Sequence, residues 1–424
     1  MDAIDTIVVG ASSVMKALHG KESAVDQAAD RRAAELQDDW QKAALMAQFG
    51  EALRALEDAE HDTSPRVLHS PQNPLAARLQ SALAEQSLDL SPLSEGGNEL
   101  KFDEVTDPFG WLWSVIRDWN NDHHPIRRPA SADPVAVPDD FKMVLFADWA
   151  TGLYGAPKVR DTIASMPGRV DLLMHLGDTY YAGSEKEMRQ RLLGYWPKRL
   201  DAVNRALNGN HEMYSGGWAY FDVVLPHFTQ PASYFSMQNT HWLLIALDTA
   251  HTNFNIDAEQ AAWLKETIAR HATDRKVMLF SHHQIFSQLD HQGMDLTMSV
   301  ASLLQEKQID YWYWGHEHRC VFYDKHDGFD VRARCIGNGG MPQARGRVPT
   351  LPATEPQGDY SWRRVEKKGG VPGALVLDGP NPYITGHESR YSPHGFVAVH
   401  LQGAAAHEKC LLPDGTAVWD KPLP

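Results

Sequence analysis

The stretch "VLFADWATGLYG", residues 144–155, opens with four apolar residues that run directly into Asp148. An apolar run without alternation predicts a strand that is covered on both faces. Such a strand delivers its last side chains to loops on a rigid sheet, where metal-binding and catalytic groups often lie. Asp148 is therefore a candidate metal ligand, although a single carboxylate after a strand is more often a turn former or a helix cap.

Five further apolar runs between residues 170 and 318 repeat this pattern. Helix-like segments lie between several of them, at residues 185–200 and 257–272. Strands that alternate with helices predict a layered α/β domain. After His318 the chain is predicted to be rich in strands, and a stretch with many Gly and Pro residues, 341–394, is predicted to form loops near the site. The five runs are "VDLLMHLGD", "RALNGNHE", "HWLLIALDT", "KVMLFSHH" and "IDYWYWGHEH".

Residues 1–135 differ in composition from the rest of the chain. They are rich in Ala, Leu, Glu, Gln and Arg, which favour helices, and apolar residues recur at three- and four-residue spacing. The Pro-rich run 125–138 predicts an extended linker. We therefore expect an α-helical N-terminal region with its linker over residues 1–135, and a catalytic domain over residues 136–424. The N-terminal helices are a candidate surface for homo-oligomer formation.

The bulk composition excludes several classes of protein. A net charge of -15 argues against stable nucleic-acid binding, which needs clustered Lys and Arg. Three widely spaced cysteines form neither a disulfide framework nor a CxxC zinc motif. The N-terminus has no basic segment followed by an apolar stretch, so we expect no signal peptide, no membrane association and a cytoplasmic location.

Five of the strand-like runs end in residues that can hold a metal ion. Carboxylate, amide oxygen and imidazole are ligands for hard and borderline metals. Each motif is weak alone, because "GD" is common and a single His is more often structural. Five such motifs in one order, each after an apolar run, favour a metal site. The candidates are Asp148, Asp178 in "GDTYY", Asn210 and His211 in "GNHE", His282 and His283 in "SHHQ", and His316 and His318 in "GHEH".

The series D…GD…GNHE…H…GHxH resembles the calcineurin-like metallophosphoesterase superfamily over roughly residues 140–405. The resemblance implies a β-sandwich of two mixed sheets flanked by helices, with two metal ions bridged by Asp178. It places Asn210, His282 and His316 on one ion, and Asp148 and His318 on the other. The family spacing favours His282 over His283 as the ligand from "SHHQ", and both residues stay candidates.

The position two residues after Asp148, where much of the family has a histidine, is Ala150. "GDTYY" places Tyr181 three residues after Asp178, which resembles the purple acid phosphatase branch and its GDxxY motif. The resemblance implies a tyrosinate from Tyr181 and Fe(III) at the site of Asp148, Asp178, Tyr181 and His318. A second divalent ion, Fe, Zn or Mn, is then expected at Asp178, Asn210, His282 and His316.

These residues predict a phosphatase that acts on small anionic phosphomonoesters, with a metal-bound hydroxide as nucleophile. His211 is expected to stabilise the transition state or to protonate the leaving group. Glu212 either orients His211 or only begins a helix, and His283 is a candidate contact to substrate phosphate. Two alternatives remain: a phosphodiesterase, for example on a cyclic nucleotide, and a binding scaffold that has lost catalysis.

Overall fold

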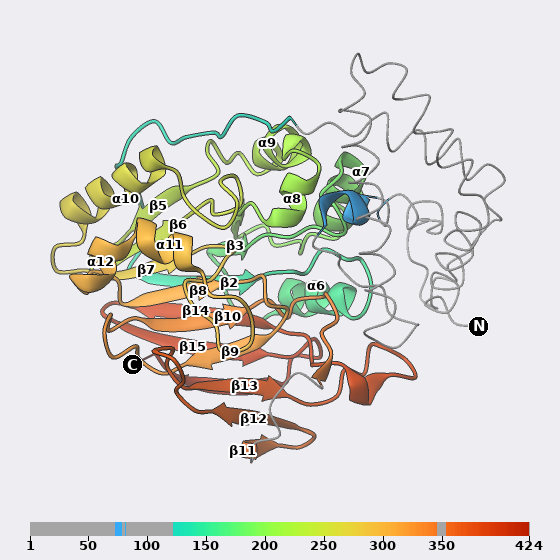
Figure 1. Ribbon diagram of the computed structural model, residues 1–424. Coiled ribbons are helices and arrows are strands. Elements are labelled where there is room, and N and C mark those ends of the chain that lie inside the picture. Colours follow the sequence, from blue (N-terminus) through green and yellow to red (C-terminus); the bar gives the residue numbers. More distant parts are fainter. Residues whose placement is uncertain (1–72, 79–80, 82–121, 346–352, 424) are drawn as a thin grey trace, which may run out of the picture. The chain divides into compact units, whose positions relative to one another are not determined.

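The computed structural model describes residues 73–78, 81, 122–345 and 353–423. Most of the predicted helical region 1–135, with its oligomer interface, lies outside these residues. Residues 74–78 are helical. The larger compact unit comprises His124–Met213 and Gly217–Pro424, so the whole Pro-rich run predicted as a linker, 125–138, belongs to it. Figure 1 labels the helices and strands of this unit.

One mixed sheet has ten strands. Its centre, β6, β7, β8 and β10, is parallel, and the strands from β10 to β11 pair antiparallel. In spatial order the strands are β1 (Val135–Ala136), β5 (Phe235–Gln238), β6 (Trp242–Ala246), β7 (Lys276–Phe280), β8 (Tyr311–Trp314), β10 (Arg332–Ile336), β9 (Cys320–Tyr323), β13 (Ala374–Asp378), β12 (Tyr360–Val365) and β11 (Ala353–Gln357).

The second mixed sheet has six strands. Its strands β2, β3 and β4 are parallel, and β14 joins β2 antiparallel. In spatial order they are β16 (Ala417–Pro422), β15 (Ala405–Leu411), β14 (Phe396–Gln402), β2 (Asp140–Phe146), β3 (Leu172–His175) and β4 (Val203–Ala206).

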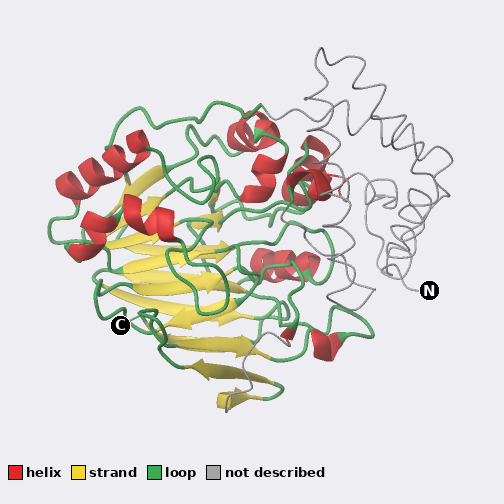
Figure 2. Cartoon of the chain, viewed as in Figure 1, coloured by secondary structure: helices red, strands yellow, loops and turns green. Residues whose placement is uncertain are grey.

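Strand β2 shows how the layers are built. Met143 and Leu145 enter the apolar core between the two sheets, whereas Val144 and Phe146 face the core under the helices. Alternate side chains of a strand point to opposite faces, so a strand that is apolar throughout is buried on both sides. The fold prediction is thereby confirmed, and Figure 2 shows the strands between flanking helices. The helical segments are α6 (Ala156–Ser165), α7 (Glu185–Glu187), η1 (Met188–Leu193), α8 (Asn210–Tyr214), η2 (Tyr220–Val224), α9 (Leu225–His227), α10 (Ala258–His271), α11 (Met294–Ser299), α12 (Ala301–Gln305) and η4 (Glu388–Arg390).

The two predicted helices have different outcomes. The segment 257–272 forms α10, and the Asp257 side chain caps it by accepting from Gln260 N at 2.8 Å. The segment 185–200 is helical only as far as Leu193. Proline disfavours helical backbone at the residue before it, and Gly and Pro stand at positions 194 and 197.

The Gly- and Pro-rich stretch 341–394 is only partly a set of loops. Residues 353–378 contain three antiparallel strands that extend one edge of the ten-stranded sheet. The prediction of loops throughout was wrong, because Trp362 and Val376 bury apolar side chains that the Gly and Pro content conceals. Trp362 also donates its indole N–H to the carbonyl of Val418 at 2.8 Å.

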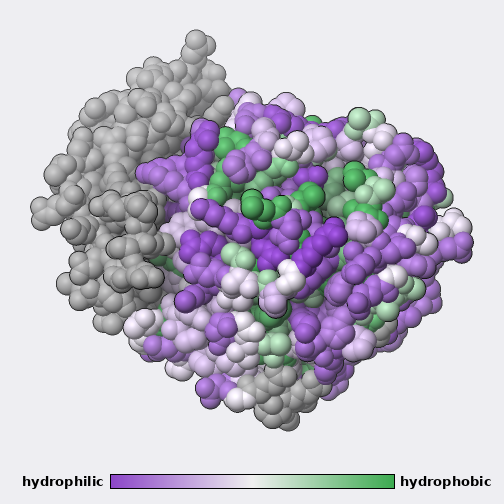
Figure 3. Space-filling view, turned by 180° about the vertical axis from the view of Figure 1, so that it is seen from behind, coloured by the Kyte–Doolittle hydropathy of each residue, from purple (hydrophilic) through white to green (hydrophobic). Residues whose placement is uncertain are grey.

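Polar side chains dominate the face drawn in Figure 3, with smaller apolar patches between them. Among the helices that the structure describes, none has the length and apolar character needed to cross a bilayer. The three cysteines are buried thiols, as the composition suggested.

His175, at the end of β3, provides a test of this packing. Its ring is fully buried against Phe146 and Trp149, and neither ring nitrogen has a hydrogen-bond partner within the described residues. Burial, and to a lesser extent the charge of His282, lowers the pKa of His175 to about 3. In the unfolded chain the His175 ring therefore binds a proton near pH 6.5, whereas in the folded protein it stays neutral until the pH is much lower.

We expect stability to fall as the pH drops below 6.5, and His175→Leu to remove part of that loss. Between pH 6.5 and pH 4.5 the free energy of unfolding of the wild type should fall by about 2–3 kcal/mol more than that of the variant. Urea titrations in a chelator, which removes metal binding from the comparison, measure both slopes. Equal pH dependence in the two proteins would show that His175 is solvated or paired.

Candidate metal centre

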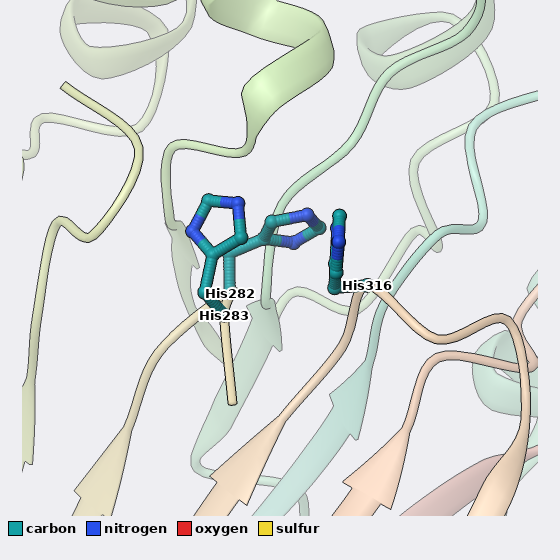
Figure 4. A group of neighbouring side chains, drawn as sticks. All are labelled: His282, His283 and His316. Atoms are coloured by element: carbon teal, nitrogen blue, oxygen red, sulfur yellow. The ribbon is translucent and has the colours of Figure 1, made fainter. Parts of the chain in front are cut away.

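The predicted ligands follow the carboxyl ends of parallel strands. Asp148, Asp178 and Asn210 come after β2, β3 and β4 of the six-stranded sheet, and His282 and His316 come after β7 and β8 of the ten-stranded sheet. Parallel strands bring their carboxyl ends to one edge, where ligands of α/β proteins bind. Figure 4 shows His282, His283 and His316 at these strand ends, with their rings turned toward one another.

The backbone at the motifs is unusual. Four predicted ligands have positive φ angles: Asp148 at 54°, Asp178 at 72°, His316 at 67° and His318 at 52°. Asp and His enter the left-handed region more readily than most residues, yet the conformation costs energy and clusters at functional sites. Gly209, which precedes the predicted ligand Asn210, is also required at its position, because a Cβ there would lie 2.2 Å from Asp178 Oδ1.

Two carboxylates, a phenol and an imidazole form the first donor group, which comprises Asp148, Asp178, Tyr180 and His318. The Tyr180 hydroxyl lies 2.9 Å from Asp148 Oδ1, 3.4 Å from Asp178 Oδ2 and 2.9 Å from His318 Nε2. His318 Nε2 is 3.4 Å from Asp148 Oδ1. Donors bound at about 2.0–2.2 Å to one ion lie about 3.0–3.4 Å apart, so this spacing fits a shared metal ion.

The structure places Tyr180, and not the predicted Tyr181, in this group. The Tyr181 ring lies under the Arg191 guanidinium, whose Cζ is 5.5 Å from the ring centroid. Tyr180 and Tyr181 lie in a turn, where neighbouring side chains need not point the same way. The backbone of "GDTYY" therefore selects one tyrosine, and the spacing alone did not reveal which one.

Ala150 leaves the space that this arrangement uses. It is fully buried, pairs with Thr179 in an isolated parallel bridge, and accepts the backbone N–H of Tyr180 at 3.3 Å. The position without a ligand side chain thus holds the backbone of the tyrosine whose hydroxyl reaches Asp148. The motif predicted Tyr181 for this role, whereas the tyrosine that contacts Asp148 is Tyr180.

Electrostatics supports a cation at the first donor group. Burial, together with Asp148 and Asp178, raises the pKa of Tyr180 well above its usual value. A phenol carries one proton, so it cannot donate at once to both carboxylates and to an imidazole. Buried negative charge without compensation is strongly unfavourable, and a multivalent cation would neutralise it.

The second donor group comprises Asp178, Asn210, His282, His283 and His316. His282 Nε2 lies 3.2 Å from Asp178 Oδ1 and 3.0 Å from Asn210 Oδ1. His283 Nε2 lies 3.3 Å from the same Asn210 oxygen. The three imidazoles each bring one nitrogen within 4.8 Å of the others. Both histidines of "SHHQ" therefore face the site, whereas a regular strand would separate them.

Contacts of the other ring nitrogens distinguish the two histidines. His282 Nδ1 lies 2.9 Å from the carbonyl of Leu176, the backbone partner that commonly orients a metal-bound imidazole. Burial lowers the pKa of His282, but Asp178 overrides this effect and raises it to about 9. His283 Nδ1 instead lies 3.0 Å from the Thr249 hydroxyl. His282 is thus the better-oriented ligand.

His211 lies beside the first donor group. Its ring centroid is 4.7 Å from that of Tyr180, and its Nε2 is 3.7 Å from Asp178 Oδ2. Nδ1 is in hydrogen-bond contact with the carbonyl of Tyr181. Burial lowers the pKa of His211. The carbonyl contact holds the proton on Nδ1 and turns Nε2 toward the acidic residues.

Glu212 follows His211 in α8, and its carboxylate contacts the backbone of two ligand loops. Its buried Oε2 accepts the backbone N–H of Asp178 at 3.0 Å and that of Gly209 at 2.8 Å. The carboxylate thereby joins the "GD" and "GNHE" turns. Glu212 itself is a residue of α8, so the prediction that it begins a helix is met. Its role is to position two ligand loops, since it satisfies two buried backbone donors.

The calcineurin-like phosphoesterase family pattern matches residues 121–320. No curated protein sequence matches the chain. Solved structures that resemble it include the purple acid phosphatase PPD1 of yellow lupin (Lupinus luteus), with 14% identity and a TM-score of 0.48. The match covers 69% of this chain and 54% of that enzyme, so the chain spans about half of its length.

Two other solved structures resemble the chain, one with the same TM-score and one with a lower TM-score. GAP50 of Plasmodium, described as the anchor in the inner membrane complex, has 12% identity and a TM-score of 0.48, over 67% of this chain and 88% of that one. A predicted phosphoesterase of Streptococcus pneumoniae has 10% identity and a TM-score of 0.29, over 67% and 97%.

Proposed function

We propose that the chain, whose residues 121–320 match the calcineurin-like phosphoesterase family, is a binuclear, metal-dependent phosphatase acting on phosphomonoesters. One observation carries the proposal. Asp178 directs Oδ2 to Tyr180 in the first donor group, at 3.4 Å, and Oδ1 to His282 in the second, at 3.2 Å. A carboxylate that presents one oxygen to each of two donor groups is suited to bridge two ions.

The donor sets favour different ions. Asp148, Asp178, Tyr180 and His318 would hold Fe(III), because two carboxylates and a phenolate are hard anionic donors. The amide of Asn210 with the imidazoles of His282 and His316 would hold a divalent ion, Fe, Zn or Mn. When bound, the two ions supply charge stabilisation to the phosphoryl oxygens and lower the pKa of water.

The chain's own residues contribute proton transfer and positioning. His211 keeps its Nδ1 proton on the Tyr181 carbonyl, so as an imidazolium it carries a second proton on Nε2 that it can give to the leaving oxygen. Glu212 keeps the "GD" and "GNHE" turns together through two backbone N–H groups. The Tyr180 side chain is fully buried beside the rings of His211 and His318, and burial strengthens its electrostatic interactions.

The test of the metal assignment compares two adjacent tyrosines. Wild-type protein loaded with iron should absorb visible light through charge transfer from phenolate to Fe(III). Tyr180→Phe should lose this band, because a phenyl ring has no oxygen that could bind the iron beside Asp148 and His318. Tyr181→Phe is the matched control and should keep it. Metal analysis of all three proteins accompanies the spectra.

A band that disappears in Tyr181→Phe and persists in Tyr180→Phe would reverse the assignment. A colourless wild type that still binds two divalent ions would remove iron from the proposal while leaving the phosphatase. The ester class is tested on the same samples, by turnover of a monoester, glycerol 2-phosphate, beside a diester, a cyclic nucleotide. Turnover of the diester alone would refute the monoesterase.

A further inference from the structure

A half-buried aromatic ring, Phe254, lies against the second donor group. It belongs to the segment 247–257, which connects β6 to α10. Its centroid is 4.0 Å from that of His283, with a tilt of 48°, and 5.1 Å from that of His316, edge to face. The metal-binding motifs include no residue of this segment, so neither the metal ligands nor the proposed proton transfer explains the ring.

The backbone at this position is strained. Phe254 has a φ of 62° and the preceding Asn253 has a φ of 45°, so two successive residues are left-handed. Asn tolerates this conformation, but for a bulky side chain it is an outlier, and Gly would adopt it freely. Selection for stability alone would not place Phe here. Strain that persists beside an active site points to a function for the residue that bears it.

Hydrogen bonds within the segment hold the ring in place. The Asp248 carboxylate accepts the backbone N–H groups of Ala250 at 3.2 Å and His251 at 3.0 Å. The backbone N–H of Asn255 donates to the carbonyl of Thr249 at 3.1 Å, which closes the turn. A ring on so constrained a loop is preorganised, and it loses little freedom when a ligand packs on it.

We propose that Phe254 forms the wall of the leaving-group pocket and gives the enzyme a preference for phosphate esters of aromatic alcohols. This rests on the proposed function, because the phosphoryl group must lie at the metal ions for the leaving group to reach the ring. A planar leaving group would then contact Phe254 edge to face or offset, an arrangement that favours aromatic partners over aliphatic ones.

The experiment measures binding of two phosphonates that cannot be hydrolysed. Phenylphosphonate and methylphosphonate are titrated calorimetrically into metal-loaded wild type, Phe254→Ala, Phe254→Leu and Phe254→Tyr. The wild type should bind phenylphosphonate about three- to tenfold more tightly than methylphosphonate. This ratio should fall toward one in Phe254→Ala, fall partly in Phe254→Leu, which keeps apolar bulk, and be retained in Phe254→Tyr.

Metal content is measured in every variant, since the ring also covers two imidazoles. The proposal is overturned if Phe254→Ala and Phe254→Leu, with two ions bound, keep the wild-type ratio, or if the wild type shows no preference. Failure of the proposed function gives a separate result: no phosphomonoester is hydrolysed, whatever the phosphonate ratio. A wild type that hydrolyses monoesters without the phenyl preference refutes this inference alone.

Discussion

Asp178→Ala should lose both metal ions and lower kcat/KM for phosphomonoesters by roughly 10³-fold or more. The reason is that one carboxylate serves both donor groups, with Oδ1 at 3.2 Å from His282 Nε2 and Oδ2 at 3.4 Å from the Tyr180 hydroxyl. Without it, each group keeps too few anionic donors to neutralise a multivalent ion. Metal analysis by mass spectrometry and steady-state kinetics measure the two effects.

Asp171→Asn is the matched control. Asp171 lies at the opposite end of β3 from Asp178, where its carboxylate accepts the backbone N–H of Lys142 at 2.9 Å. This variant removes a buried carboxylate at the other end of the same strand but leaves both donor groups intact, so it should bind two ions. If Asp178→Ala lost only one ion, Asp178 would belong to a single site and the bridging geometry would be refuted.

His211→Ala should lower kcat by about 10²–10⁴-fold while both ions stay bound, as expected for the loss of a general acid. Its Nε2 is 3.7 Å from Asp178 Oδ2, and its Nδ1 contacts the Tyr181 carbonyl, so the side chain is positioned by the backbone and not by a metal. Truncation to Ala retains the backbone N–H that donates to Asp178 Oδ1 at 3.0 Å.

The leaving group separates a proton donor from a group that only stabilises charge. An alkoxide must be protonated as it departs, whereas 4-nitrophenolate leaves readily without a proton. The defect of His211→Ala should therefore be larger for glycerol 2-phosphate than for 4-nitrophenyl phosphate. Equal defects on both substrates would assign His211 to charge stabilisation at the phosphoryl group. An exposed histidine, His227, provides the control substitution, and His227→Ala should match the wild type.

Much of the architecture could be predicted from the chain because its signals are local. Apolar runs without alternation predicted strands buried on both faces, and the structure confirms this for β2, β3, β6, β7 and β8, whereas the edge strand β4 is partly exposed. A polar residue after each run predicted which side chains meet, since parallel strands share a carboxyl edge. The prediction failed where Gly and Pro hid short strands, at residues 353–378, because pairing with a sheet edge outweighed local propensity.

In the site, too, some features follow from the local sequence and others from the tertiary structure. The order and spacing of Asp148, Asp178, Asn210 and His316 are properties of the chain, and strands of known direction suffice to bring them together. The choice between Tyr180 and Tyr181 belongs to the folded protein, because the path of the backbone after Asp178 determines which neighbour faces the acidic residues.

Other contacts depend on the packing of segments distant in sequence. Glu212 reaches the backbone of Asp178, and Phe254 reaches His283, only because separate loops converge on one edge of the sandwich. No periodicity or spacing encodes such a meeting, since it arises from the combined geometry of two sheets. The local pattern of this chain thus specifies the strands and the kind of ligand at each end, and the packing of the sheets selects the side chains that complete the metal centre.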